Sequence, residues 1–269
     1  MTTYLDDLLD AARVRVADAR ALEPLEALRE RATDLPAPPS FRDALGRPGV
    51  QLVAEVKRAS PSKGDLAPDL DAPEQARAYV DGGAAAVSVL TEPTRFKGDL
   101  ADLADVAALG VTALRKDFLV DAYQVWEARL AGASAVLLIV AALDEATLGA
   151  LHDEARTAGL DVLVEVHDDH EVAAAAAVGA EVVGVNARDL RTFELDRDGF
   201  RRLRALLPDG ALAVSESGVR DADDVRRAAD EGADAVLVGE SLVRATDPRA
   251  AAAALVAAGA PTRDQEVRA

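Results

Sequence analysis

The segment GASAVLLIV at residues 132–140 decides the fold, because it joins a glycine-alanine turn to an unbroken apolar run. The same pattern returns three times, as GGAAAVSVL at 82–90, GAEVVGVN at 179–186 and GADAVLVGE at 232–240. The leading glycines are 47 to 53 residues apart. Four further apolar runs lie outside these segments: QLVAEV at 51–56, VTALRKDF at 111–118, DVLVEV at 161–166 and ALAVSES at 211–217. Together the eight runs predict eight strands.

The segments between these runs have helical spacing of apolar residues, such as Leu203, Leu206 and Leu207. Near-continuous apolar strands that alternate with helices are typical of a parallel sheet covered by helices. Eight such units predict an α/β fold of the (β/α)8 type, a TIM barrel. The alternative is an open doubly wound sheet, which usually has a glycine-rich dinucleotide motif after its first strand. Here that position reads VKRASPSKG at 56–64.

The chain of 269 residues matches the length of one barrel domain. We expect a helical extension at 1–45, a barrel at 46–258 and a frayed tail at 259–269, with no linker between them. The extension contains two helix candidates. The first has Leu5, Leu8, Leu9 and Ala12 on one face, and the second has Pro24 in its first turn. We expect these helices to cap one mouth of the barrel.

The composition excludes several classes of function. There is no cysteine, so disulfides and thiol chemistry are excluded. The net charge of −18 disfavours nucleic acid and anionic membranes as partners, because both would be repelled. We expect a cytoplasmic protein, since the amino terminus lacks the pattern of a signal peptide and no apolar run is long enough to cross a membrane. The acidity is spread along the chain, which favours a halophilic type of surface.

Charged residues close several of the predicted strands, where active sites of such barrels are built. Glu55 and Lys57 lie two apart in one strand, so they point to the same side, and we expect that side to be the barrel axis. Lys116, Glu165 and Glu216 close three other strands. Neighbouring carboxylates keep a lysine protonated, which suits general-acid work or anion binding rather than Schiff-base chemistry. The alternative is an ion-pair network with a purely structural role.

Two glycine-containing strand ends suggest a phosphate site. Ser217-Gly218 follows the seventh strand and Gly239-Glu240-Ser241 follows the eighth, and we expect each to lead straight into a helix. Helix amino termini bind anions, and the loops after strands 7 and 8 are the usual phosphate position in this fold. A glycine can also end a strand simply to turn the chain.

The run His167-Asp168-Asp169-His170 resembles a set of metal ligands. Acidic residues at this position more often cap a helix, which we expect to begin near Asp169. We therefore predict no metal site.

These motifs resemble those of the indole-3-glycerol phosphate synthase family, barrel enzymes of tryptophan biosynthesis. The resemblance covers about residues 3–258 and rests on five segments: EVKRASPSKG at 55–64, LRKDF at 114–118, LVEVH at 163–167, GVNARDL at 184–190 and SESG at 215–218. It implies ring closure of 1-(2-carboxyphenylamino)-1-deoxyribulose 5-phosphate, with loss of carbon dioxide and water, to give indole-3-glycerol phosphate. It implies no cofactor and no metal.

The resemblance also implies roles for individual residues. Lys116 would be the general acid toward the ribulose carbonyl, and Glu165 would assist the dehydration as acid or base. Lys57 would hold anionic groups and donate a proton. The remaining implied positions line or orient the site (Glu55, Asn186, Glu216 and Ser217), brace the site or bind the substrate carboxylate (Arg188), or hold the phosphate (Ser60, Gly218, Gly239 and Ser241). The order of proton transfers by the two lysines stays open.

Rival functions fit the residues less well. Phosphoribosylanthranilate isomerase would demand a cysteine base, which this chain lacks. A two-aspartate sugar isomerase would close strands 1 and 5 with aspartate, where this chain has Glu55 and Glu165. A catalytically silent barrel would not need so complete a polar set. The expected partners are a phosphorylated small molecule and, among proteins, other enzymes of the tryptophan pathway; the sequence does not give the oligomeric state.

Overall fold

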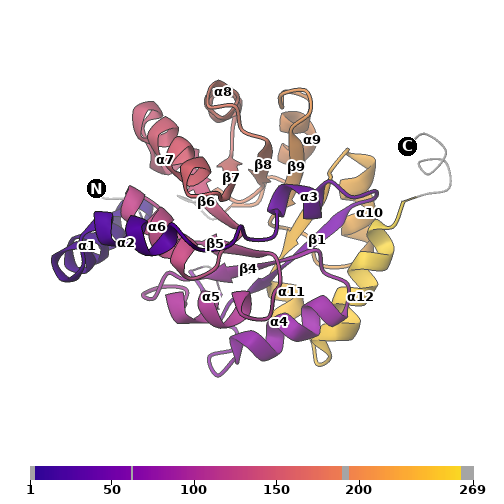
Figure 1. Ribbon diagram of the computed structural model, residues 1–269. Helices are drawn as coiled ribbons and strands as arrows, with labels where there is room; N and C mark the ends of the chain where they lie inside the picture. Colours follow the sequence, from indigo (N-terminus) through magenta and orange to yellow (C-terminus); the bar gives the residue numbers. More distant parts are fainter. Residues whose placement is uncertain (1–3, 62, 190–193, 262–269) are drawn as a thin grey trace.

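Eight parallel strands close into a barrel in the computed structural model, which describes residues 4–61, 63–189 and 194–261. The strands follow one another around the barrel in chain order, and the last pairs with the first (Figure 1). Their bounds are β1 (Gln51–Val56), β4 (Ala86–Leu90), β5 (Ala113–Lys116), β6 (Ala135–Ile139), β7 (Asp161–Val166), β8 (Val182–Asn186), β9 (Leu212–Glu216) and β10 (Ala235–Val238). The eight predicted strands and the closed barrel are confirmed, and the open sheet is excluded.

Alternation along each strand divides the core into two layers. Val53, Leu137 and Leu163 belong to an apolar cluster inside the barrel. Val56 and Leu138 belong to a second cluster, which includes the apolar faces of the surrounding helices. Because Val56 packs outward, Glu55 and Lys57 face the barrel interior, as predicted.

Helices surround the barrel, and aspartate begins most of them. The helices of the barrel are α4 (Ala72–Asp81), α5 (Leu100–Ala107), α6 (Ala122–Leu130), α7 (Glu145–Thr157), α8 (Asp169–Ala177), α9 (Gly199–Arg204), α10 (Ala222–Asp230), α11 (Glu240–Val243) and α12 (Pro248–Gly259), with a 3-10 turn, η1 (Val140–Ala142), after β6. All but α9 and α11 have an aspartate N-cap whose side chain accepts a backbone N–H. Such a cap contributes about 1 kcal/mol. Asp168 caps α8, so the capping role predicted for this acidic run is confirmed.

The amino-terminal extension covers both mouths of the barrel rather than one. It forms α1 (Tyr4–Leu22), α2 (Leu25–Ala32) and α3 (Phe41–Leu45), and α1 and α2 lie beside α6 (Figure 1). Leu5 and Leu8 of α1 reach the cavity at the carboxyl ends of the strands. Phe41 and Leu45 of α3 are fully buried in the inner cluster. The backbone N–H of Arg42 donates to Asp161, the first residue of β7, which places α3 at the amino ends.

Two features of the extension differ from the prediction. Pro24 is the N-cap residue of α2 and does not lie in its first turn. The helix α3 was not predicted, because five residues are too few for helical periodicity to stand out.

The loop after β1 forms a small antiparallel hairpin of β2 (Ala59–Ser60) and β3 (Gly64–Asp65), which the sequence did not predict. Arg58 precedes it and makes an ion pair with Asp102 of α5. Its Nε also donates to the carbonyl of Leu70 at 3.1 Å. The hairpin is therefore anchored to the barrel next to β1. Ser62, quoted above in the first motif, lies outside the described residues.

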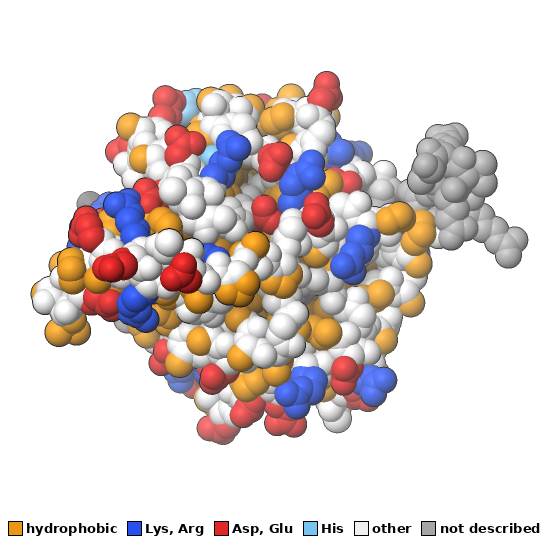
Figure 2. Space-filling view, viewed as in Figure 1, with side chains coloured by type: hydrophobic (Ala, Val, Ile, Leu, Met, Phe, Trp, Pro, Cys, Tyr) orange, Lys and Arg blue, Asp and Glu red, His pale blue; other side chains and the backbone are white. Residues whose placement is uncertain are grey.

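The carboxyl end of the described chain packs beside the amino end of β1. The N–H of Val50 donates to the carbonyl of Gly259 at 2.7 Å, so α12 extends one residue past the expected end of the barrel. Residues 262–269 of the expected tail lie outside the described residues. In the part of the chain that the structure describes, no helix is both long and apolar enough to cross a membrane. Figure 2 shows acidic and basic side chains interspersed on the side that it draws.

Candidate active site

A cavity of about 430 Å³ opens at the carboxyl ends of the strands. All the site residues predicted from the sequence line it, although they come from six different strand ends and loops. They are Glu55, Lys57, Ser60, Lys116, Glu165, Asn186, Arg188, Glu216, Ser217, Gly218, Gly239 and Ser241. The fold therefore brings together residues that are far apart in the chain.

Lys57 and Glu55 form the first ion pair of the cavity. The Nζ of Lys57 lies 2.5 Å from Oε1 of Glu55. Both are close to Gly239 on the loop after β10. A Cβ at position 239 would meet Glu55 Oε1 at 2.5 Å and Lys57 Nζ at 2.9 Å. A residue larger than glycine would therefore displace this pair.

Lys116 forms the second set of ion pairs, at the end of β5. Its Nζ lies 3.4 Å from Glu165 Oε2 and 3.7 Å from Glu216 Oε2. Burial by itself would lower the pKa of Lys116, but the charges of Glu165, Glu216 and Glu55 outweigh it and raise the pKa above its ordinary value. Lys116 therefore stays protonated at neutral pH and is held as an ammonium at the cavity wall.

The two carboxyl groups beside Lys116 have different electrostatic environments. Burial and the charge of Glu165 raise the pKa of Glu216 to about 8. Burial also disfavours ionisation of Glu165, yet Lys116, His167 and a hydrogen bond from Asn186 together lower its pKa. Of this pair, Glu165 is the ionised member near neutral pH and Glu216 the protonated one. The Oε1 atom of Glu216 is buried, with no hydrogen-bond partner among the described residues.

Asn186, at the end of β8, orients several groups at once. Its Nδ2 donates to Glu165 Oε1 at 3.2 Å, and its Oδ1 accepts from Ser217 Oγ at 2.8 Å and from the N–H of Arg188 at 3.0 Å. Because one amide holds a carboxylate and two loop residues, the loops after β8 and β9 are tied to the buried cluster. Residues 190–193, which include Leu190 of the fourth motif, lie outside the described residues.

The predicted phosphate loops lie at one end of the cavity. Ser241 Oγ is buried and has no hydrogen-bond partner within the described chain. Ser217 and Gly218 both have positive φ, 64° and 84°, which turns the chain away from β9. One expectation is wrong: α10 does not follow this turn directly. It begins at Ala222, and Asp221 already caps its first N–H groups.

Three cationic residues that the sequence analysis did not select lie near this end of the cavity. Lys63, Arg220 and Arg244 all line it. Lys63 and Arg244 approach Glu240 at 4.0 and 3.4 Å. The scarcity of lysine could have pointed to Lys63, because three of the four lysines in the chain line this cavity. Nothing in the sequence distinguishes Arg220 and Arg244 from the many other arginines of the chain.

The rest of the lining is apolar. Phe96 and Phe118 lie with their ring centroids 6.2 Å apart, and aliphatic side chains from β6 and α1 lie on the same wall. An aromatic ring would fit against this wall, since such rings pack well on one another. The sequence could not select these residues, because apolar side chains at strand ends look the same as core residues.

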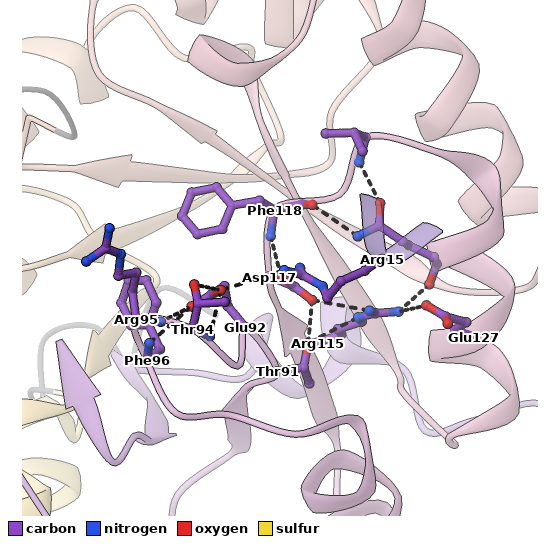
Figure 3. A network of polar contacts seen from close by, with 12 residues as sticks. Arg15, Thr91, Glu92, Thr94, Arg95, Phe96, Arg115, Asp117, Phe118 and Glu127 are labelled. Atoms are coloured by element: carbon purple, nitrogen blue, oxygen red, sulfur yellow. Dashed lines mark hydrogen bonds and ion pairs between the residues drawn. The ribbon is translucent and has the colours of Figure 1, made fainter. Parts of the chain in front are cut away.

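A second network of charges lies behind Lys116, and Figure 3 shows it close up. Asp117 accepts four hydrogen bonds. Its Oδ1 accepts from Arg15 of α1 and from the backbone N–H of Phe118, and its Oδ2 accepts from Thr91 and Arg115. Arg115 also donates to Glu127 and to the carbonyl of Gln124. This network joins α1, the loop after β4 and α6 around the end of β5.

Within the described residues, no group of three or more histidine or acidic side chains is placed to hold a metal ion. Lysines and carboxylates surround a cavity with a cationic end and an apolar wall. The fold and this cavity define the class of protein: a parallel (β/α)8-barrel with an acid–base site at the carboxyl ends of its strands.

Comparisons with known proteins identify the family. The family model for indole-3-glycerol phosphate synthase matches residues 5–255. Indole-3-glycerol phosphate synthase from Mycobacterium ulcerans is 50% identical over 258 residues, which cover 96% of this chain and 95% of that protein. The enzyme of the same name from a Nocardioides species is 54% identical over 254 residues, covering 93% and 96%. The chain belongs to the indole-3-glycerol phosphate synthase family and is a carboxy-lyase of tryptophan biosynthesis that binds a phosphorylated small molecule.

Solved structures with low sequence identity support the fold alone. A crystal structure of 3-hexulose-6-phosphate synthase superposes with a TM-score of 0.65 at 19% identity, covering 78% of this chain and 100% of that one. The enzyme of that name from Salmonella typhimurium gives a TM-score of 0.63 at 19% identity, covering 78% and 98%. These similarities agree with the barrel and carry no information about the substrate.

Proposed function

We propose that the cavity described above is where the ring closure takes place, with Lys116 as the general acid. The observation that supports this most directly is the placement of Lys116. Its side chain is 16% exposed and lines the cavity, and the charge of Glu165, 3.4 Å away, keeps its ammonium group protonated. A buried proton donor beside an open cavity is what protonation of a substrate carbonyl requires.

The substrate has three groups to place: a phosphate, an aromatic carboxylate and a ketone. In our proposal the phosphate lies against Ser60, Gly218, Gly239 and Ser241. Lys63 and Arg244 add positive charge at that end. The aromatic ring lies on the apolar wall formed by Phe96 and Phe118, and Arg188 binds its carboxylate. The ketone then lies between the two ends, near Lys116.

The first step forms the carbon–carbon bond. The ring carbon that bears the carboxylate attacks the ketone carbon while Lys116 donates a proton to the ketone oxygen. Carbon dioxide then leaves, and the pair of electrons from its bond restores the aromatic ring. Lys116 suits the donor role better than an arginine would, because arginine does not give up its proton in proteins.

The second step removes water from the alcohol that the first step creates. We assign proton donation to the leaving hydroxyl, together with removal of the proton from the adjacent methylene carbon, to Glu165 and Lys57. Glu165 acts as acid or base in this step. Glu55 holds Lys57 in place through the ion pair at 2.5 Å, and Asn186 holds Glu165 through the hydrogen bond at 3.2 Å. Glu216 and Ser217 complete the wall on the same side.

The proposal is tested by turnover of the carboxyphenylamino substrate, followed by the fluorescence of the indole product in molar salt without added metal. Lys116→Ala should lose most of the turnover, by about 10²-fold or more, and keep its affinity for substrate. Lys97→Ala is the matched control, because Lys97 pairs with Asp65 at 2.7 Å and does not line the cavity. An unchanged rate in Lys116→Ala would remove Lys116 from the mechanism.

We further propose that the enzyme works in the cytoplasm and that its contacts with macromolecules are confined to other enzymes of the tryptophan pathway. The net charge of −18 supports this, because it opposes binding to nucleic acid and to anionic lipid. Sedimentation with anionic vesicles at low salt is the simplest check. Binding there would contradict the proposal.

A further inference from the structure

His167 follows β7 directly and lies between two carboxylates. Its Nδ1 is 3.0 Å from Oε2 of Glu171 on α8, and its Nε2 is 3.4 Å from Oε1 of Glu165. The Nε2 atom is buried and makes no hydrogen bond to any described residue. An imidazole with one nitrogen bonded and the other turned to a carboxylate can pass a proton between the two.

The three residues also form a path from the outside of the barrel to its interior. The Glu165 side chain is only 1% exposed, whereas those of His167 and Glu171 are 14% and 13% exposed. Glu165 lines the cavity and His167 is not among the residues that line it. The imidazole contacts Oε1 of Glu165, whereas the ammonium group of Lys116 contacts Oε2.

The proton balance of the reaction calls for such a path. The ketone oxygen takes up two protons before it leaves as water, and the methylene carbon gives up one as the new double bond forms. Loss of the carboxylate as carbon dioxide leaves its electron pair in the ring and supplies no proton. One proton per turnover must therefore come from solvent, while the substrate fills the mouth of the cavity.

We propose that His167 is a positioning residue for Glu165 and a proton relay that connects it to solvent through Glu171. This inference rests on the proposed function, because it requires Glu165 to change its protonation state in each turnover. Whether Glu165 acts as acid or base in the dehydration, its starting state must be restored before the next turnover. His167 restores it through Oε1 while the substrate or product still occupies the cavity.

The charges around His167 fit this role. The groups that face it are Glu165 from β7, Glu171 from α8 and Glu216 from β9. Burial lowers the pKa of His167, but the hydrogen bond to Glu171 and the charges of the carboxylates raise it above its ordinary value. An imidazole that is readily protonated near neutral pH can both receive and release a proton there.

A structural role does not account for the imidazole. Asp168 and Glu171 fix the start of α8 together, and Asp168 Oδ1 accepts the N–H of Glu171 at 2.9 Å. In return, Glu171 Oε2 accepts the backbone N–H of His167 at 2.7 Å. The cap thus uses only the backbone of residue 167. Its side chain can change while the helix start is kept.

The test compares His167→Gln with His170→Gln by steady-state kinetics over a range of pH. His170 is exposed in the first turn of α8 and serves as the matched control. His167→Gln should lower kcat by at least about tenfold, leave KM within about twofold and alter the pH profile of kcat. His170→Gln should match the parent in all three. Glu171→Gln, which keeps the oxygen that caps the helix, should lower kcat in the same way.

A second measurement separates the relay from a packing role. His167→Ala should regain part of its turnover when imidazole is added. Loss of turnover with an unaltered pH profile and no rescue by imidazole would overturn the relay, as would a parental kcat in His167→Gln. Glu165→Gln distinguishes the two proposals. If it retains full turnover, the role of Glu165 in the proposed function fails; if it is inactive while His167→Gln is fully active, the relay alone fails.

Discussion

Two networks of buried charges lie on opposite sides of β5, and their differences separate chemistry from structure. Lys116 points into the barrel toward Glu165 and Glu216, at distances of 3.4 and 3.7 Å. Arg115 points outward into the network of Figure 3, where Asp117 accepts four hydrogen bonds. The inner network has a lysine at a cavity and a carboxyl oxygen without a partner among the described residues, and the outer one has arginines whose carboxylate partner is saturated.

Two neighbouring charged residues of one strand, Arg115 and Lys116, therefore have different roles. Arginine forms several hydrogen bonds in a fixed plane and keeps its proton, so it suits a permanent joint between α1, β5 and α6. Lysine has a point charge that carboxylates can tune, so it suits proton transfer.

Exchanging lysine and arginine at positions 116 and 115 should affect turnover at one position and stability at the other. Lys116→Arg keeps the charge of the inner network but removes an effective proton donor, so we expect kcat to fall by about 10²- to 10⁴-fold with little loss of stability. Arg115→Lys should do the reverse, lowering the free energy of unfolding by about 1–3 kcal/mol and kcat by only a few-fold. Steady-state kinetics and denaturant unfolding of both variants check this. Equal losses of turnover in the two variants would contradict the assignment of catalysis to Lys116 and of a structural role to Arg115.

Removing the carboxylate of the outer network should be the most damaging change to stability. Asp117→Asn leaves Arg15 and Arg115 without their shared buried anion, which we expect to cost about 3–5 kcal/mol. Asp223→Asn is the control, since Asp223 pairs with Arg226 on an exposed face of α10 and should cost under about 1 kcal/mol. Guanidinium unfolding measures both. A loss for Asp117→Asn no larger than that of the control would mean that the outer network does not hold the fold.

The inner network depends on glycine as well as on charge. A Cβ at Gly184 would lie 2.0 Å from Glu216 Oε1, so Gly184→Ala must displace that carboxyl group. We expect a cost of about 1–3 kcal/mol, together with a fall in kcat. Gly149 lies inside α7 with no atom near its missing Cβ, so Gly149→Ala should raise stability by up to about 1 kcal/mol. Thermal unfolding of the pair decides, and a neutral Gly184→Ala would show that Glu216 can move freely.

Glu216 should also give the stability a particular pH dependence. Its pKa is raised to about 8 in the folded protein, so the native state binds a proton that the unfolded chain releases above its ordinary pKa of 4.5. The free energy of unfolding should therefore fall as the pH rises from about 5 to 8, by at most about 1.4 kcal/mol per pH unit from this group. Glu216→Gln should flatten that slope in unfolding experiments at each pH. The same slope in the variant would assign it to other groups.

The strand ends were the most predictable part of the site. Alternation placed Glu55 and Lys57 on the axis, because a strand turns successive side chains to opposite faces. The cationic end was only partly predicted, since Lys63 is one of few lysines but Arg220 and Arg244 are among many arginines. Phe96 and Phe118 were missed, because nothing in an apolar residue's type tells a cavity wall from a core.

The amino-acid sequence was sufficient to specify the eight strands, the closed barrel and the carboxyl and amino groups that meet at its mouth. It could do so because repeated apolar runs specify parallel strands, and parallel strands end at a common edge. The tertiary structure determined which carboxyl group keeps its proton, and it placed the imidazole of His167 3.4 Å from Oε1 of Glu165. It also decided that α1 and α3 cover opposite mouths and that Arg115 faces away from the cavity. These outcomes depend on distances, burial and the packing of segments far apart in the chain, which no local pattern contains.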